Sequence, residues 1–423
     1  MTPSGLWRLI LTAVPLVLFP GAVAETPLRA GMQRLCAGTD SEFPRVAQIA
    51  GCDWIIQSPE TSPPHLAIAF YNRGVSRRAA GDTDGAIADY GEAIRVNPNY
   101  ASAFTNRGNA RRDQHDLAGA IADYTEALRI NPFSASSLTN RGNARREQGD
   151  LPGAIEDHGA AIKAQPSFAL AWRNRGLAHH DLGDLKAALA DFDEAIRLDP
   201  SYALGFHNRA LARRANGDPQ GAVEDYDALL RLRPRHAQAF HERGLARGDL
   251  GDLAGAVADQ DTAIRLDRRI AAAALTARGL ARIARGQAEA AMPDLLAAFS
   301  MTPKDAQPLA GLCLARHRMQ RRGATAGECT LATAAARPRE GWPHAVRGGI
   351  ALASGDLGTA AADLAEALQR EPTLATALFL RAILRQWEGN EAGAAADAAT
   401  ARQSRPRIGE QVSELFGPDL VLN

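Results

Sequence analysis

Residues 71–98 read YNRGVSRRAAGDTDGAIADYGEAIRVNP, and this stretch decides the fold. Its pattern recurs every 34 residues in six consecutive segments, which begin at Ala67, Ala101, Ala135, Ala169, Ala203 and Ala237. Four weaker copies begin near Ala272, Ala306, Gly341 and Ala375. A fixed period of this length predicts a tandem array of small units, not two or three separate compact domains.

Each copy carries the signals of two helices joined by a tight turn. In the first copy Gly81 precedes Asp82, and the same pair recurs in most copies. Glycine ends a helix in the left-handed conformation, and aspartate caps the start of the next helix. Pro98 and its counterparts stop the second helix. Small residues, such as Gly74, let two helices approach closely, and a bulky residue, such as Tyr90, would fill the space between them. Each copy is therefore expected to be a closely packed hairpin of a helix A and a helix B.

The period of 34, with small residues at repeat positions 8, 20 and 27 and proline at 32, resembles the tetratricopeptide repeat family. The resemblance covers Ala67 to about Ile408. It implies an all-α, right-handed α-solenoid of about ten helix-turn-helix repeats whose helices A line a concave groove. It also implies binding of peptides or protein surfaces, without enzymatic activity. The RNA-reading pentatricopeptide repeats are the nearest alternative, but their period is usually one residue longer. The formal net charge of zero also argues against nucleic acid as the partner.

The N-terminus has the features of a secretory signal peptide. Arg8 precedes a short apolar run from Leu9 to Phe19, and Ala22-Val23-Ala24 supplies a small-x-small cleavage site after Ala24. An uncleaved anchor is the alternative, although the run is too short to cross a bilayer. We therefore expect residues 1–24 to be removed and the mature chain to be periplasmic or secreted, without a transmembrane segment.

The remaining chain divides into four parts. We expect an N-terminal cap at 25–66, six regular repeats at 67–270, four degenerate repeats at 271–408, and a capping helix with a tail at 409–423. The seam near Arg269 lacks the usual proline and has one extra residue. At the C-terminus Val412, Leu415 and Phe416 share one helical face, which suits a helix that covers the last repeat.

Four cysteines in an exported chain suggest two disulfides. Cys36 and Cys52 are 16 residues apart, and so are Cys313 and Cys329. The first pair would hold the N-terminal cap, and the second would staple the most degenerate repeat. Neither pair has the CxxC spacing of redox or metal sites, so such a role is the weaker alternative.

A pair of charged positions changes together from copy to copy. Position 7 is Arg and position 23 is Asp in nine of ten copies, as in Arg107 and Asp123, and both change in the eighth copy. We interpret this as a structural bridge, either between helices A and B or between adjacent repeats. A role as ligand contacts is the alternative.

A stripe of helix A residues is the candidate ligand-binding surface, because its positions share one helical face. It comprises Asn109, Arg112, Asn143, Arg146, Arg173, Leu177, His180, His207, Leu211 and Arg214. Helices A carry excess arginine and helices B excess acid, so this groove is expected to be basic and polar. It suits an extended segment with carboxylates and one or two apolar anchors.

The function predicted from these features is an exported scaffold that binds peptide segments or envelope proteins. A structural or self-assembly module acting through its outer face and ends is the alternative, and an accessory subunit of an enzyme is a further one. The sequence contains no nucleophile elbow, metal-ligand cluster or Gly-rich phosphate loop, so we predict no catalytic activity, cofactor or metal. A metal or pH-sensitive site formed by His180, His207 and His241 is a minor alternative.

Overall fold

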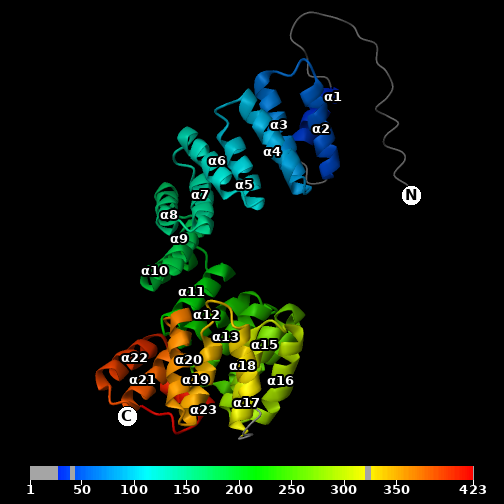
Figure 1. Ribbon diagram of the computed structural model, residues 1–423. Coiled ribbons are helices and arrows are strands. Elements are labelled where there is room, and N and C mark those ends of the chain that lie inside the picture. Colours follow the sequence, from blue (N-terminus) through cyan, green and yellow to red (C-terminus); the bar gives the residue numbers. More distant parts are fainter. Residues whose placement is uncertain (1–26, 39–42, 320–324, 423) are drawn as a thin grey trace, which may run out of the picture. The chain divides into compact units, whose positions relative to one another are not determined.

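The computed structural model describes residues 27–38, 43–319 and 325–422, and the predicted signal peptide lies outside them. These residues form 23 α-helices and a short 3-10 helix, with no strand in the described ranges (Figure 1). None of the described helices combines the length and hydropathy needed to cross a membrane. Successive helices pair as hairpins, so the fold is an all-α solenoid.

The chain divides into two compact units, residues 1–144 and residues 145–423. The first unit contains α1 (Pro27–Ala37), α2 (Arg45–Gln57), α3 (Pro63–Ala79), α4 (Thr83–Val96), α5 (Ala101–Asp113), α6 (Leu117–Ile130) and most of α7 (Ala135–Gln148). Helix A of the first repeat, α3, starts at Pro63, four residues before the repeat begins in the sequence. Two prolines occupy the start of this helix, where proline is tolerated because its missing N–H would have no partner within the helix.

The second unit continues the hairpins to the end of the chain. Its helices up to the expected seam are α8 (Leu151–Ala164), α9 (Ala169–Leu182), α10 (Leu185–Leu198), α11 (Ala203–Ala215), α12 (Pro219–Leu232), α13 (Ala237–Asp249) and α14 (Leu253–Leu266). The 3-10 helix η2 (Arg268–Ile270) then joins α14 to α15 at the place where the sequence lacks its proline.

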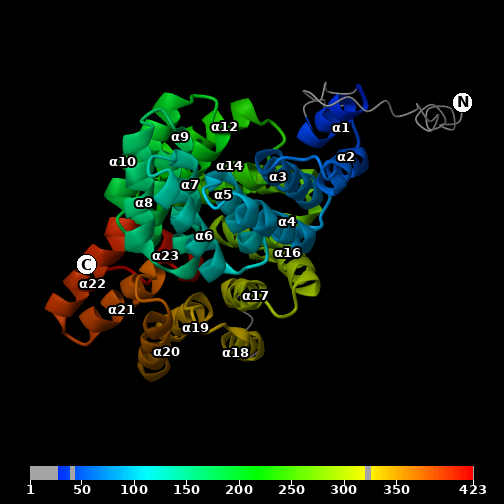
Figure 2. The same cartoon turned by 90° about the horizontal axis from the view of Figure 1, so that it is seen from above.

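Beyond η2 the described chain forms four more hairpins and a last short helix. These are α15 (Ala271–Ala284), α16 (Ala288–Met301), α17 (Ala306–Arg318), α18 (Thr325–Ala335), α19 (Trp342–Ala353), α20 (Leu357–Arg370), α21 (Ala375–Trp387), α22 (Glu391–Ser404) and α23 (Ile408–Phe416). Figure 2 shows the same helices from above.

The turn between helices A and B has the predicted chemistry. Gly81 has a φ of +89°, in the left-handed region. Asp82 accepts a 2.9 Å hydrogen bond from the backbone N–H of Gly85 and so caps α4. In the second copy His115 takes the left-handed position with a φ of +62°, because glycine is absent there.

Close packing between helices A and B depends on glycine at repeat position 8. A Cβ added at Gly74 would lie 2.7 Å from the ring of Tyr90, and one added at Gly108 would lie 2.7 Å from the ring of Tyr124. Both tyrosines are buried, with at most 1% of their surface exposed. The bulky ring therefore fills the space that the missing side chain leaves, as the sequence predicts.

The predicted bridge between positions 7 and 23 is confirmed. Arg107 donates from Nε and Nη2 to the two carboxylate oxygens of Asp123, at 3.0 and 2.6 Å. The same forked pair joins Arg73–Asp89, Arg175–Asp191, Arg209–Asp225, Arg243–Asp259, Arg278–Asp294, Arg347–Asp363 and Arg381–Asp397. A second arginine, from position 11, reaches the same carboxylate, as in Arg111–Asp123 at 2.9 Å.

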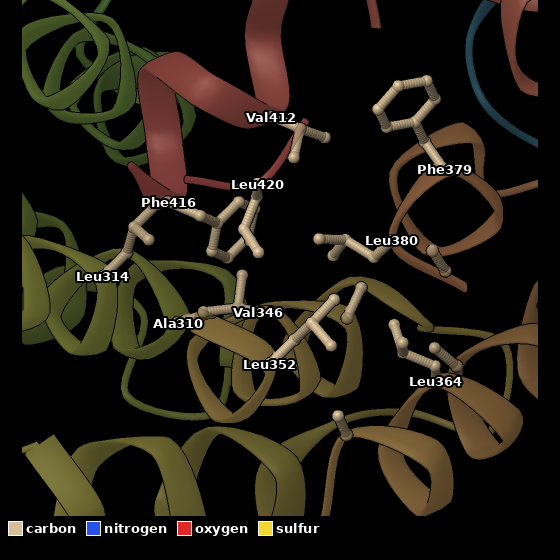
Figure 3. Close-up of a cluster of buried hydrophobic side chains, with 14 of the residues drawn as sticks. Ala310, Leu314, Val346, Leu352, Leu364, Phe379, Leu380, Val412, Phe416 and Leu420 are labelled. Atoms are coloured by element: carbon tan, nitrogen blue, oxygen red, sulfur yellow. The ribbon is translucent and has the colours of Figure 1, made fainter. Parts of the chain in front are cut away.

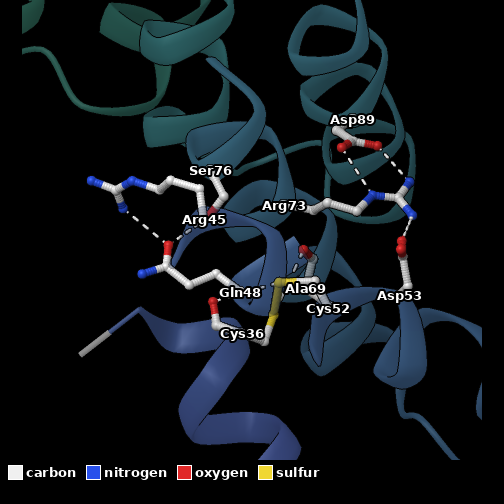
Figure 4. The surroundings of a disulfide bond; sticks show 9 residues. All are labelled: Cys36, Arg45, Gln48, Cys52, Asp53, Ala69, Arg73, Ser76 and Asp89. Atoms are coloured by element: carbon white, nitrogen blue, oxygen red, sulfur yellow. Dashed lines mark hydrogen bonds and ion pairs between the residues drawn. A yellow bond between two sulfur atoms is a disulfide. The ribbon is translucent and has the colours of Figure 1, made fainter. Parts of the chain in front are cut away.

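The N-terminal hairpin of α1 and α2 packs onto the first repeat (Figure 4). The sulfurs of Cys36 and Cys52 lie at disulfide-bonding distance, with Cα atoms 4.5 Å apart. Asp53 on α2 accepts a 2.6 Å hydrogen bond from Arg73, the position 7 arginine of the first repeat. The cap thus uses the same arginine that bridges the helices of that repeat.

The second cysteine pair lies in the degenerate repeat formed by α17 and α18. Cys313 and Cys329 also lie at bonding distance, with Cα atoms 5.2 Å apart, and both are buried. They occupy positions 8 and 24, where a glycine meets a bulky ring in the regular copies.

Helices A form the concave side of each unit. Consecutive helices A contact one another, as α3 contacts α5 and α17 contacts α19. Among the described residues no two consecutive helices B make a comparable contact. Because the A helices are closer together than the B helices, the stack curves toward the A side.

Candidate protein-binding surface

The predicted binding stripe lies on helices A, and its residues are half-buried. Three of them, Asn109, Arg112 and Asn143, belong to the first unit. The other seven belong to the second unit: Arg146, Arg173, Leu177, His180, His207, Leu211 and Arg214.

Asn109 is occupied by internal hydrogen bonds. Its Oδ1 accepts from the Tyr124 hydroxyl at 2.7 Å and from Nδ2 of Asn140 at 3.0 Å. Its Nδ2 is 3.4 Å from Oδ1 of Asn106. This side chain therefore ties its own helix pair to the next repeat and has little capacity left for a ligand.

Two of the predicted cationic ligands are paired with acids of the following repeat. Arg146 donates to Asp181 at 2.6 Å, and Arg214 donates to Asp249 at 2.6 Å. In the first unit Arg78 donates to Asp113 in the same way, at 2.7 Å. These pairs join position 12 of one repeat to position 13 of the next and form a ladder along the concave side, which reduces its positive charge.

Sequence reasoning missed this ladder, although it was visible in the repeat register. An arginine and an acid separated by 35 residues recur through the regular copies, as in Arg146 and Asp181. Covariation within a single repeat does not reveal such a pair, because its two residues belong to adjacent repeats.

The ladder is interrupted between α9 and α11. Position 13 of the fifth repeat is Ala215, so no acid follows His180 at the next repeat. The carboxylate nearest to His180 is that of its own neighbour Asp181, at 3.7 Å from Nδ1. At this place in the second unit the helices A lack the acid that completes the ladder.

Arg173 lies on the same face of α9. Its Nη1 donates to Oδ1 of Asn174 at 3.2 Å, and its Nε is buried without a hydrogen-bond partner. An unpaired guanidinium N–H in a low-dielectric setting favours a carboxylate partner. Leu170 precedes Arg173 by one turn on α9, and Leu204 holds the same repeat position on α11; 38% and 49% of their surfaces are exposed.

Leu177 and Leu211 are less available than those two leucines. Leu177 packs on the buried cluster around Phe192. Leu211 lines a hollow together with Arg214, Leu374 and Arg405. The apolar part of the site is therefore made mainly by Leu170 and Leu204.

The three histidines do not come together. His207 lies with its ring 6.0 Å from that of Tyr226 and 6.5 Å from that of His236, and burial lowers the pKa of His207. The Nδ1 atom of His241 is 2.7 Å from Oε1 of Gln260. No group of three metal-ligating side chains occurs in the described part of the chain, so the suggested metal site is wrong.

The C-terminal helix α23 occupies the concave side farther along the second unit. It contacts α15, α17, α19 and α21, which are all helices A. It therefore lies across four repeats, whereas a helix capping only the last repeat was expected. A cavity of about 350 Å3 lies beside it and is lined by residues of α13, α15, α19 and α21, including Leu245, Leu280 and Trp342.

Comparisons with known proteins agree with this architecture. Residues 71–135, 139–203 and 207–268 match a tetratricopeptide repeat model. No curated protein matches the sequence.

Solved structures of repeat proteins resemble parts of the chain. A MamA crystal structure is 23% identical over 39% of this chain and 96% of its own, with a TM-score of 0.36. A tetratricopeptide repeat protein from Parabacteroides merdae is 23% identical over 56% of this chain and 93% of its own, with a TM-score of 0.46. YrrB, described as having an unusual peptide-binding site, is 21% identical over 42% and 92%, with a TM-score of 0.37. The matched residues show that the part of the chain between residues 71 and 268 consists of tetratricopeptide repeats, and the helical hairpins described above continue beyond it.

Proposed function

We propose that the protein is an exported scaffold that binds an extended segment of a partner protein on the concave face of α9 and α11. The observation that carries this proposal is the interruption of the ladder at Ala215, which leaves the face of α9 and α11 without the acid that completes the ladder elsewhere in the unit. Elsewhere in the second unit the arginines at position 12 are paired, as Arg214 is with Asp249.

The chemistry of this face defines the kind of segment that it would hold. A carboxylate of the partner would pair with the half-buried guanidinium of Arg173, and apolar side chains would lie on Leu170 and Leu204. The stripe therefore suits an acidic segment with one or two apolar anchors. This is narrower than the general basic groove expected from the sequence.

Photo-crosslinking tests the proposal in intact cells of the source organism. A photoreactive amino acid at Leu204 is expected to trap a discrete partner protein. The same group at Leu232, an exposed leucine at the end of a helix B, serves as the matched control and is expected to trap none. Adducts of equal yield from both positions would contradict binding at the concave face.

A charge reversal makes the test specific. Arg173→Glu is expected to abolish the Leu204 adduct, whereas Arg197→Glu, on helix B α10, is expected to leave it unchanged. If the trapped protein is a second copy of the chain, the self-assembly alternative holds and the scaffold proposal fails.

Export is tested separately by the N-terminus of the mature protein. Mass spectrometry of the protein purified from the cell envelope or medium is expected to find Glu25 as the first residue. A chain that retains residues 1–24 would contradict cleavage after Ala24.

A further inference from the structure

The C-terminal segment, residues 405–420, lies on the concave side of the second unit in the manner of a bound helix. The apolar residues of α23 follow each other at a spacing of four: Ile408, Val412 and Phe416. These three and Leu420 are all buried to 2% exposure or less. Figure 3 shows Val412, Phe416 and Leu420 pointing toward Leu314, Val346 and Leu380.

The opposite face of α23 carries charged side chains that pair within the segment. Arg407 pairs with Glu410, and its Nη2 also lies 3.6 Å from a carboxylate oxygen of Glu414. The Arg407 guanidinium also lies against the turn at Gly251, where a Cβ added to the glycine would clash with it, and its Nη1 is buried without a hydrogen-bond partner. The helix therefore has one apolar face directed into the repeats and one mainly polar face. This is the arrangement of an amphipathic helix in a hydrophobic groove.

One edge of this segment is held by polar contacts beside a cavity. Arg405 lies 3.3 Å from a carboxylate oxygen of Asp249 on α13, and Gln411 donates to the backbone oxygen of Asp249 at 3.3 Å. The 350 Å3 cavity lies at this edge, and a Cβ added at Gly248 would meet no atom within 4 Å. The contact with α13 thus lacks the dense packing found against α17, α19 and α21.

We propose that the concave face of α15, α17, α19 and α21 is a receptor for an amphipathic helix, with residues 405–420 as its built-in ligand. A partner helix with apolar residues at i, i+4 and i+8 exchanges with this segment when the contacts to Asp249 open. Because a tethered ligand acts at millimolar effective concentration, the closed segment keeps weak binders out. This receptor face lies on different helices from the site on α9 and α11 and does not depend on it.

A labelled synthetic peptide of residues 405–422 tests the exchange in the full-length protein. Fluorescence anisotropy would compare its binding to the wild type and to Arg405→Ser/Gln411→Ala, which removes both contacts to Asp249 but leaves the Arg214–Asp249 pair intact. The variant is expected to bind the peptide at least tenfold more tightly than the wild type. The matched control, Arg402→Ser/Gln403→Ala on α22, changes the same residue types at exposed positions and is expected to behave as the wild type.

The peptide itself supplies the second control. Val412→Asp in the peptide places a charge at a position that is fully buried in the protein and is expected to abolish binding. Binding that survives this change, equal binding to wild type and variant, or no binding to either, would overturn the proposal.

Hydrogen exchange decides whether the segment can open at all. Amides of residues 408–416 are expected to exchange by local opening, faster than those of α19 and α21, and faster still in the Arg405→Ser/Gln411→Ala variant. If they exchange only together with α19 and α21 in both proteins, the segment is ordinary core and the receptor proposal fails. Arg173→Glu is expected to leave peptide binding unchanged, which separates this test from that of the proposed function.

Discussion

Arg243 donates a 2.5 Å hydrogen bond from Nη1 to the carboxylate of Asp227, which belongs to the preceding repeat. The same arginine also holds Asp259 of its own repeat. A position 7 arginine can therefore bridge two repeats as well as two helices. The acid at position 25 recurs in Asp193 and Asp261, and Asp53 supplies it in the N-terminal cap.

At the junctions between repeats that lack an acid at position 25, introducing one is expected to stabilise the protein. Position 25 is Gly91 in the first repeat and Gly159 in the third. A Cβ at either residue would come within 3.8 Å of Nη1 of the next arginine and would meet no other atom closer. We expect Gly159→Asp to stabilise the protein by about 0.5–1 kcal/mol, measured by urea unfolding, since the new pair is partly exposed.

Asparagine at the same position is the control for helix propensity. Gly159→Asn gives a similar change in propensity without the charge. If it stabilises the protein as much as Gly159→Asp does, the inter-repeat ion pair contributes nothing measurable.

Removal of a buried carboxylate that accepts hydrogen bonds should change the free energy of unfolding much more than Gly159→Asp does. Asp123 is 3% exposed and accepts hydrogen bonds from Arg107 and Arg111. Asp123→Ala leaves both guanidinium groups without their carboxylate, so we expect a loss of about 3–5 kcal/mol in the free energy of unfolding. Glu126→Ala, which breaks an exposed pair with Arg129, should cost less than about 1 kcal/mol in the same assay. Equal effects of the two changes would exclude a special role for the buried bridge.

The bridges within repeats and the ladder between repeats differ in how readily the repeat sequence predicts them. The Arg107–Asp123 bridge was predictable because the two positions recur together in nine copies. The ladder pairs, such as Arg146 with Asp181, recur too, but only a comparison across adjacent copies detects them. The placement of α23 follows no repeat, since its contacts with four helices A occur once in the chain. Its amphipathic pattern predicted a buried face, but the pattern contains no information about which surface covers that face.

The free energy of unfolding should fall in mild acid because His158 is buried in its neutral form. His158 is fully buried at the bulky position of its repeat, and both ring nitrogens lack hydrogen bonds. Burial, assisted by the charges of Arg146 and Arg175, lowers the pKa of His158 from 6.5 to about 4. The unfolded chain therefore binds the proton first, so stability is complete above pH 6.5 and declines as the pH falls toward 4, by on the order of 3 kcal/mol.

The substitution His158→Phe isolates this contribution, because Phe192 fills the same position in the next repeat. Urea unfolding at pH 7.5, 5.5 and 4.5 should show a steeper loss for the wild type than for the variant. Parallel curves for the two proteins would mean that His158 does not titrate on unfolding in this range.

The two cysteine pairs are expected to be oxidised in the protein purified from cells. Intact mass under non-reducing conditions should be lower by four hydrogens than after reduction. Cys313→Ala/Cys329→Ala should lose about 3 kcal/mol of stability, because the bond closes a short loop in the unfolded chain. If reductant leaves the melting temperature of the wild type unchanged, the predicted stapling of this repeat is wrong.

The hydrogen bond from Gln411 to Asp249 joins residues that are 162 positions apart in the chain. A linear repeat array has nearest-neighbour contacts only, and it can lose its terminal repeats one at a time. While α23 is in place, the last repeats cannot fray without separating α23 from α15 and α17, so local opening of α23 should precede any loss of these repeats. The contact between Gln411 and Asp249 can form only after the 162 positions of chain that separate them have been arranged, which makes it a late and slow step of folding.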